Sequence, residues 1–231
     1  MEELIVLQNF FGNQKPDFHQ ICFAKSVEAG NLQIATAFFN QHYLNKKICK
    51  NNTEYPLVCA IQAKSFEIVQ LLVQGGSDIN QTSSEETSPL SLSLKLFQDK
   101  IARYLIQLGC DVTIPDSNQS IPLHYASFSS TIDIVKMIVE KTPNIDAVDN
   151  QGDTALYYSM VSNNLDIFNY LIQAGANIHF SMNNRHVIHN ACSLRKVEMT
   201  KILIQLGVSI HVTNNQGETP LLIASKKGDF A

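Results

Sequence analysis

Three side chains that can bind a metal ion are spaced three residues apart, at His186, His189 and Cys192. On a helix, residues at this spacing share one face, and imidazole nitrogens together with a thiolate are common ligands of Zn²⁺. Two more histidines, His179 and His211, lie close by in the sequence. The chemistry that this group could perform is metal binding, and it has to be weighed against a structural role for each residue.

Catalysis requires a nucleophile, a base and an orienting group, or a metal cluster, at one convergent site. The sequence contains no Gly-x-Ser-x-Gly motif, no His-Glu-x-x-His motif and no glycine-rich phosphate-binding loop. We therefore expect no enzymatic activity, no catalytic residues, no cofactor and no small-molecule substrate.

Composition and charge argue against several further classes of protein. The 231 residues are 45% hydrophobic and 16% charged, which is typical of a folded protein. The net charge is -4 and the basic residues are scattered, so a nucleic-acid partner is not expected. Apolar stretches fall far short of the roughly 20 residues that cross a bilayer, and we expect no membrane association.

The N-terminus and the cysteines bear on the cellular compartment. Glu2 and Glu3 stand where a secretory signal peptide would have basic residues. The five cysteines are odd in number and form no Cys-x-x-Cys pair, which favours reduced thiols. These features predict a cytoplasmic protein, or one delivered into a host cytosol if it comes from an intracellular pathogen.

The elements that position these residues follow from an internal repeat. One short phrase, usually with proline before leucine, recurs six times. Its anchor residues are numbers 56, 89, 122, 155, 187 and 220, giving steps of 33, 33, 33, 32 and 33. A second marker has the same steps and lies 20 residues after each anchor, at Gly76, Gly109, Thr142, Gly175 and Gly207. Two phrases that share one period indicate a repeat architecture.

Each repeat contains two amphipathic runs with apolar residues at helical spacing, such as 66–73. Proline at the anchor suits the first turn of the first helix, where its missing N–H would have had no partner. Glycine at the second marker suits the left-handed residue after the second helix. Each repeat is therefore predicted to be a pair of antiparallel helices.

The 33-residue unit resembles the ankyrin repeat. The phrases that carry the resemblance are Ile121-Pro122-Leu123-His124-Tyr125-Ala126, Gly76-Ser77-Asp78-Ile79-Asn80, Gly175-Ala176-Asn177-Ile178 and Asn215-Gln216-Gly217-Glu218-Thr219-Pro220-Leu221. The resemblance implies an all-α solenoid of helix-turn-helix units with β-turn fingers. It covers residues 18–231 as about six and a half repeats, which start near 18, 51, 84, 117, 150, 182 and 215. Residues 1–17 are expected to form an N-terminal capping helix, because an apolar stripe runs from Leu4 to Phe11.

The chain departs from the family pattern in several places. Thr142-Pro143 replaces a helix-ending glycine, one residue is deleted near Asn183-Asn184, and the last repeat stops at 228–231. Half a repeat would leave the preceding apolar face partly uncovered, so we expect the natural chain to continue.

The resemblance also gives the histidines a structural role. His189, like His124, occupies the histidine position of the family phrase, where the ring usually satisfies loop backbone groups. His179 and His211 occupy the last position of the Gly-Ala-Asp-Val-Asn phrase. We therefore expect no metal site.

Binding residues are implied by the family at the turn tips and at exposed positions of the first helix. The apolar candidates on that helix are Leu96, Phe128, Val161 and Leu194, and the candidates at the tips are Glu85, Asn118, Gln151, Asp153 and Arg185. An apolar strip with a polar rim is typical of a binding surface. The alternative is that the apolar side chains pack between neighbouring repeats.

The function that follows is a protein–protein interaction module or scaffold, acting as a monomer, that binds a protein partner on the concave face of the stack. The alternative is the recognition half of a larger protein, such as an enzyme, a degradation adaptor, a channel or a pathogen effector, whose activity lies beyond the C-terminus.

Overall fold

The computed structural model describes residues 16–182 and 184–228. Contacts divide the chain into two compact units, up to Ser117 and from Asn118. We call these unit 1 and unit 2, and each is described by itself. The capping helix predicted for residues 1–17 lies outside the described residues, except for its last two positions, which begin the first described helix.

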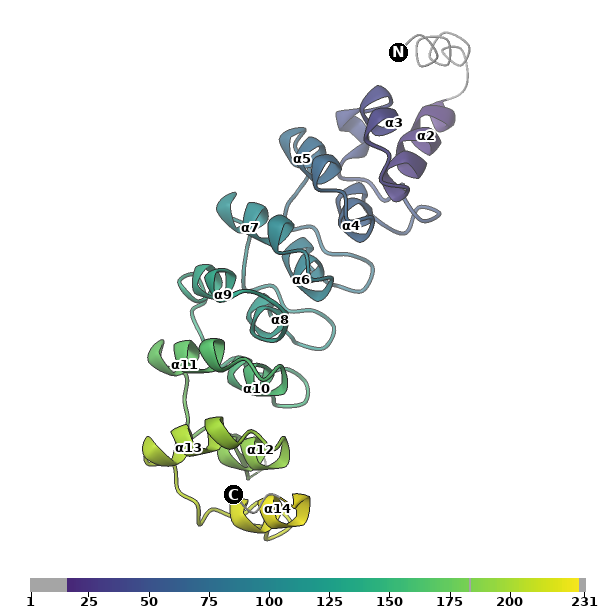
Figure 1. The fold of residues 1–231 in the computed structure, drawn as a ribbon. Coiled ribbons are helices and arrows are strands. Elements are labelled where there is room, and N and C mark those ends of the chain that lie inside the picture. Colours follow the sequence, from purple (N-terminus) through teal and green to yellow (C-terminus); the bar gives the residue numbers. More distant parts are fainter. Residues whose placement is uncertain (1–15, 183, 229–231) are drawn as a thin grey trace. The chain divides into compact units, whose positions relative to one another are not determined.

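Unit 1 is built from helix pairs joined by loops (Figure 1). Its elements are α2 (Pro16–Glu28), α3 (Leu32–Ala37), the 3₁₀ helix η1 (Gln41–Tyr43), α4 (Pro56–Gln62), α5 (Phe66–Gln74), α6 (Pro89–Lys95) and α7 (Asp99–Gln107). We call the first helix of each pair the inner helix and the second the outer helix. The inner helix α4 contacts its outer helix α5, and α6 contacts α7; the two inner helices α4 and α6 also contact each other. The unit is therefore a stack of like pairs.

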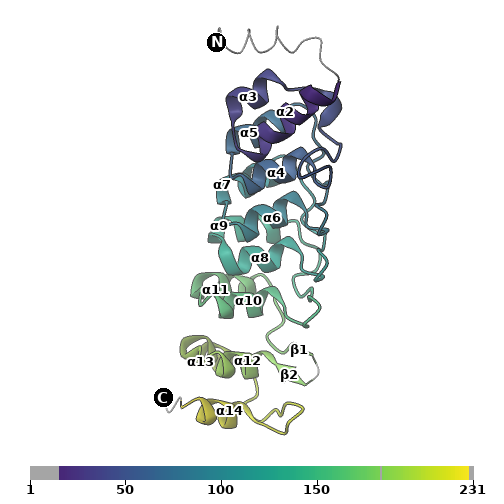
Figure 2. The same ribbon diagram turned by 90° about the vertical axis from the view of Figure 1, so that its right-hand side faces the viewer.

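Unit 2 repeats this arrangement with α8 (Pro122–Ser129), α9 (Ile132–Val139), α10 (Ala155–Val161), α11 (Leu165–Gln173), α12 (Val187–Ser193), α13 (Val197–Gln205) and α14 (Pro220–Lys227). The inner helices are α8, α10, α12 and α14. One finger loop contains a short hairpin of β1 (Ser181–Met182) and β2 (Arg185–His186), in which Ser181 pairs with His186 and Met182 with Arg185. Figure 2 shows the finger loops of unit 2 projecting from one side of its helices.

The inner helices begin where the sequence predicted. Proline occupies the first turn of α4, α6, α8 and α14. At α10, which lacks the proline, the Thr154 hydroxyl caps the helix by accepting a hydrogen bond from the Tyr157 N–H. The predicted role of the anchor phrase as a helix start is confirmed.

The chain reverses direction through left-handed residues. The glycines after the outer helices have positive φ, as at Gly109 (81°) and Gly207 (84°). The turn between inner and outer helix also uses left-handed residues, but with side chains: φ is 57° at Lys64 and 59° at Phe97, Asn163 and Arg195. Each costs about 1 kcal/mol relative to glycine, so these left-handed residues reduce stability.

The core of each unit lies between its inner and outer helices. The leucine of the anchor phrase is buried at Leu57 and Leu90 in unit 1 and at Leu123 and Leu156 in unit 2. Small residues three places later, such as Ala126 and Ser159, are fully buried as well. No helix among the described residues is long and apolar enough to cross a membrane.

Candidate functional site

The two histidines of the anchor phrase brace finger loops of unit 2. His124 Nδ1 accepts a hydrogen bond from the Ile121 N–H at 3.0 Å, and His124 Nε2 donates to the Ala147 carbonyl at 3.0 Å. Likewise, His189 Nδ1 accepts a hydrogen bond from the His186 N–H, and His189 Nε2 donates to the Val212 carbonyl, both at 3.2 Å. Burial lowers the pKa of both imidazoles, so the neutral form is favoured. The structural role predicted for these rings agrees with these bonds.

The His186, His189 and Cys192 group does not converge on a metal site. Both ring nitrogens of His189 are engaged by backbone groups, which leaves no lone pair for a metal ion. Cys192 lines a different depression from the one that His189 lines. Within the described ranges, no three His, Cys, Asp or Glu residues are grouped so as to hold a metal.

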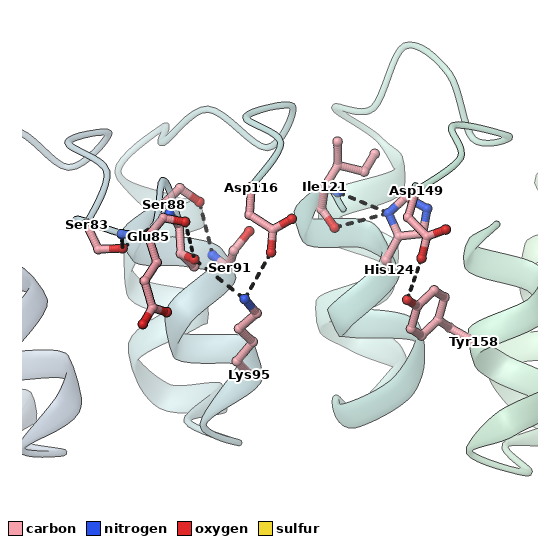
Figure 3. Close-up of polar contacts among 11 residues, drawn as sticks. Ser83, Glu85, Ser88, Ser91, Lys95, Asp116, Ile121, His124, Asp149 and Tyr158 are labelled. Atoms are coloured by element: carbon pink, nitrogen blue, oxygen red, sulfur yellow. Dashed lines mark hydrogen bonds and ion pairs between the residues drawn. The ribbon is translucent and has the colours of Figure 1, made fainter. Parts of the chain in front are cut away.

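A buried carboxylate shapes the finger at residues 149–154. Asp149 Oδ1 accepts hydrogen bonds from the Gln151 N–H (2.8 Å) and the Asp153 N–H (3.0 Å). Asp149 Oδ2 accepts from the Tyr158 hydroxyl at 2.7 Å (Figure 3). Burial and this bond raise the pKa of Tyr158. The hydrogen bond between Asp149 and Tyr158 thus connects the finger to the inner helix α10.

In unit 1, a comparable polar contact joins a loop to an inner helix. Lys95, near the end of α6, donates to the buried carboxylate of Asp116 at 2.9 Å, as Figure 3 shows. In the preceding loop, the Ser83 hydroxyl accepts hydrogen bonds from the N–H groups of Glu85 and Thr87, both at 3.2 Å. These bonds fix the loop and leave the Glu85 side chain exposed.

Two adjoining depressions lie on the finger side of unit 2. The first has a volume of about 300 Å³ and includes Tyr157, Leu194 and Ile223 in its lining. The second, of about 320 Å³, includes Gln151 and Met182. Three residues line both: Arg185, Asn214 and Gln216. We call the two together the finger-side groove.

Arg185 is the central charged group of this groove. Its guanidinium forms an ion pair with Asp153, a residue of the preceding finger. It also lies over the Tyr157 ring, with 5.4 Å between the guanidinium carbon and the ring centroid. Burial raises the pKa of Asp153, and the charge of Arg185 opposes that shift. The pair holds the guanidinium in place, while the side chain of Arg185 remains 44% exposed.

The far end of the groove carries a second ion pair. Lys226 Nζ lies 2.5 Å from Glu218 Oε1, and Asn214 donates to the other oxygen of Glu218 at 2.9 Å. These two bonds lower the pKa of Glu218. Asn190, Gln216 and Lys227 provide further polar groups in the lining. The polar lining of the groove thus combines side-chain amides with two ion-paired groups, the Arg185 guanidinium and the Glu218 carboxylate.

The predicted apolar candidates occupy different environments. Phe128, in α8, is 44% exposed, and Val161, at the equivalent position of the adjacent helix α10, is also exposed. Since α8 and α10 contact each other, these two side chains are neighbours on one face of unit 2. Leu194 is half-buried in the groove lining, and Leu96 is half-buried at the end of α6 in unit 1.

The predicted tip residues also differ in accessibility. Asn118 and Gln151 are exposed in unit 2, as Glu85 is in unit 1. Asp153 is buried, so it orients Arg185 and presents little of its carboxylate. Sequence reasoning missed Tyr157 as a member of the groove. The opposite charges of Asp153 and Arg185, at the same position of consecutive repeats, are a signal for their ion pair, but nothing in the sequence places Tyr157 beside it.

The arrangement suits noncovalent binding of a polypeptide. Side-chain amides can both donate to and accept from a peptide backbone, and Arg185 can bind a carbonyl or carboxylate. Tyr157, Phe128 and Val161 offer apolar contact area beside these groups. His189, which lines the groove, has both ring nitrogens hydrogen-bonded to backbone groups.

Comparisons with known proteins agree with this architecture. The chain matches the family model described as 'Ankyrin repeats (3 copies)' over residues 18–116 and again over 95–182, and the family model described as 'Ankyrin repeats (many copies)' over residues 188–231. No curated protein matches the sequence. Among solved structures, it is similar to the ankyrin repeat domain of Bcl-3, described as a unique member of the IkappaB protein family. That similarity has a TM-score of 0.72 and 24% identity, and it covers 88% of this chain and 93% of the other.

Proposed function

Because the chain belongs to the ankyrin-repeat family, whose repeats are protein–protein interaction modules, we propose that it binds a partner protein through the finger side of unit 2. The proposed contact surface consists of the finger-side groove together with Phe128 and Val161. The observation that carries the proposal is that the exposed Val161 follows Tyr157 by one turn of α10, and Tyr157 lines the groove with the Arg185 guanidinium over its ring. The exposed Phe128 holds the equivalent position on α8, which contacts α10. This is the usual composition of a protein-binding surface, with apolar anchors and a polar rim.

The partner segment that fits has an apolar side chain and accessible backbone groups. The apolar side chain contacts Phe128 and Val161, and the backbone bonds to the amides of Asn190, Asn214 and Gln216. Leu96 and Glu85 belong to unit 1 and make a separate, smaller contribution. The repeat fold is typically a non-catalytic scaffold, which agrees with the absence of a catalytic motif in the sequence.

The protein acts as a monomer in the cytoplasm under this proposal. None of the five cysteines, all of which lie within the described residues, forms a disulfide, and four of them are buried, which suits a reducing compartment. A net charge of -4 gives no support to nucleic acid or an anionic membrane as the binding partner.

Substitution of Phe128 tests the proposal. Phe128→Ala is expected to weaken binding of the partner recovered with the intact protein by about 2 kcal/mol or more, the size of a typical hot spot. The melting temperature should change little, since much of the ring is already in water. Affinity and melting curves are measured on the same preparation.

Leu165→Ala is the matched control, because Leu165 has a similar exposure and begins the outer helix α11 of the same unit. It should leave the affinity unchanged. A loss of roughly 3 to 5 kcal/mol in the stability of Phe128→Ala, with full affinity of the folded fraction, would instead identify Phe128 as a core residue.

A further inference from the structure

The finger at residues 81–88 of unit 1 carries five hydroxyl side chains, which differ in burial. The five are Thr82, Ser83, Ser84, Thr87 and Ser88. Ser83, Thr87 and Ser88 are buried, and Thr82 is half-buried. Ser84 is exposed, in the turn of the finger. Ser84 is therefore the hydroxyl of this finger that is most accessible to an enzyme.

Two of the buried hydroxyls hold the finger together. Ser83 Oγ accepts hydrogen bonds from the N–H groups of Glu85 and Thr87, and the Ser83 N–H donates to the Thr87 carbonyl at 2.9 Å. The Ser88 hydroxyl caps α6 by accepting from the Ser91 N–H at 3.1 Å (Figure 3). The turn and the start of α6 are thus fixed without the exposed hydroxyl.

The Ser84 hydroxyl joins two fingers of unit 1 instead. It donates to Oε1 of Glu54, a residue of the preceding finger that is 5% exposed. The Ser84 N–H donates to both oxygens of the same carboxylate, at 3.2 Å each. A buried carboxylate needs such donors, because an ionised group without a partner is costly away from water. The contact between these fingers thus relies on Ser84 as a donor.

Acidic side chains follow this hydroxyl in the sequence. Glu85 and Glu86 come directly after Ser84, and both are exposed. Protein kinases use the charge pattern around a hydroxyl to select their substrates, and two accessible carboxylates after a serine suit a kinase with a basic substrate groove. Thr53 provides a contrast in the same unit: it is exposed and followed by Glu54, but that carboxylate is buried. Ser84 thus combines an accessible hydroxyl with accessible recognition charges.

We propose that Ser84 is a phosphorylation site for an acidic-directed serine/threonine kinase, and that phosphorylation separates the two fingers that Ser84 and Glu54 join. The γ-phosphoryl group comes from Mg·ATP. The bond from Ser84 Oγ to phosphorus forms while the bond from phosphorus to the β–γ bridging oxygen breaks. ADP leaves, and the hydroxyl proton passes to a base of the kinase and then to solvent.

The product places negative charge beside the Glu54 carboxylate. Where a donor stood before, two like charges face each other in a partly buried contact, and they repel. The Ser83 bonds do not use the phosphorylated oxygen, so the turn keeps its shape while its contact with the preceding finger opens. This switch lies in unit 1 and does not depend on what binds the finger-side groove of unit 2.

Phosphorylation of the full chain by casein kinase II, an acidic-directed kinase, with Mg·ATP tests the site. Tandem mass spectrometry is expected to find phosphate on Ser84 and none on Thr53. Glu85→Gln and Glu86→Gln together should slow incorporation about tenfold, as expected for the loss of two exposed ion pairs with the kinase. Glu67→Gln is the matched control, because Glu67 is an exposed carboxylate of α5 in the same unit. It should leave the rate unchanged.

Hydrogen exchange and melting curves test the consequence. In the phosphorylated chain, the Ser84 N–H and the finger at 49–54 should exchange faster, whereas the Thr87 N–H should keep its protection. The melting temperature should fall by about 2 to 6 °C. Glu54→Gln is the control for repulsion, because it removes the charge and keeps the shape of the side chain. Phosphorylation of this variant should lower the melting temperature less.

Three results would overturn the proposal. They are phosphate on other hydroxyls of the chain but not on Ser84, an unchanged rate of incorporation in the variant with Glu85→Gln and Glu86→Gln, and unchanged exchange of residues 49–54 after phosphorylation. The chain isolated from its own cells with phosphatases inhibited is expected to carry the same phosphoserine, and its absence there would also contradict the proposal.

Discussion

Buried histidines in unit 2 connect side-chain ionisation to loop structure. The His124 ring bonds to two backbone groups in its neutral form, and burial holds its pKa below the ordinary value. The nearby Asp149 carboxylate opposes that shift without reversing it. His189 is in the same situation, with Glu218 as the opposing charge and His186 adding to the lowering of its pKa. Protonation of either ring removes one backbone bond.

These shifts predict the direction of the pH dependence. An unfolded histidine takes up a proton near pH 6.5, whereas the native His124 takes it up only at lower pH. The stability contributed by the neutral ring is therefore complete above about pH 6.5 and is lost as the pH falls through the folded pKa. Urea unfolding between pH 7.5 and 5 should show decreasing stability.

His124→Gln should flatten that decrease and lower stability at pH 7.5 by about 1 to 3 kcal/mol, because a buried backbone group loses its partner. His179→Gln, at an exposed loop position, serves as the control and should keep the wild-type slope. An unchanged slope in His124→Gln would show that other groups cause the pH dependence.

At the scale of elements, the finger loops depend on glycine to different degrees. Gly152 and Gly217 hold the same position in two fingers, and both are left-handed, with φ of 77° and 71°. A β-carbon at Gly152 would lie 2.1 Å from the Met182 sulfur, whereas one at Gly217 would meet nothing within 4 Å. The first finger is thus packed against the β1–β2 hairpin, and the second is open.

Alanine substitutions at Gly152 and Gly217 should separate the cost of a left-handed backbone from the cost of displacing Met182. Both substitutions carry the cost of a left-handed alanine, about 1 kcal/mol. Gly152→Ala should cost roughly 1 kcal/mol more, because Met182 must move out of its packed position. Chemical denaturation of both variants measures the difference. Equal losses would mean that the Met182 contact contributes nothing to stability.

The start of unit 1 exposes apolar side chains that a capping helix would cover. Ile21 of α2 and Leu32 and Ile34 of α3 are all exposed. The proposed cap at residues 1–17 carries a matching apolar stripe. Phe10→Asp should therefore lower stability by about 1 to 3 kcal/mol, the range for burial of a large apolar side chain. Asn9→Asp should have little effect, and equal melting curves for the two variants would argue against the cap.

For the whole molecule, the repeat period was the feature that sequence predicted well. Each helix pair is determined locally, by proline at the start, glycine at the end and apolar spacing between, so the anchors predicted the starts of α4, α6, α8 and α14.

The groove could not be predicted in the same way, since it depends on contacts between repeats. The Asp153–Arg185 pair joins residues of two fingers. Tyr157 and Arg185 line the groove together, with the Arg185 guanidinium over the Tyr157 ring. A repeat alignment treats each copy separately and does not contain this information.

The most direct test of the central claim is site-specific photo-crosslinking of the full chain in its own cells. A photoreactive amino acid is placed at Val161 or Leu194 on the finger side, or at Leu165 on the outer helix, and adducts are identified by mass spectrometry. We predict that Val161 and Leu194 yield the same partner protein, that Leu165 yields none of it, and that Phe128→Ala removes the adducts. The same partner captured only from Leu165, or equally from all three positions, would contradict binding through the finger side.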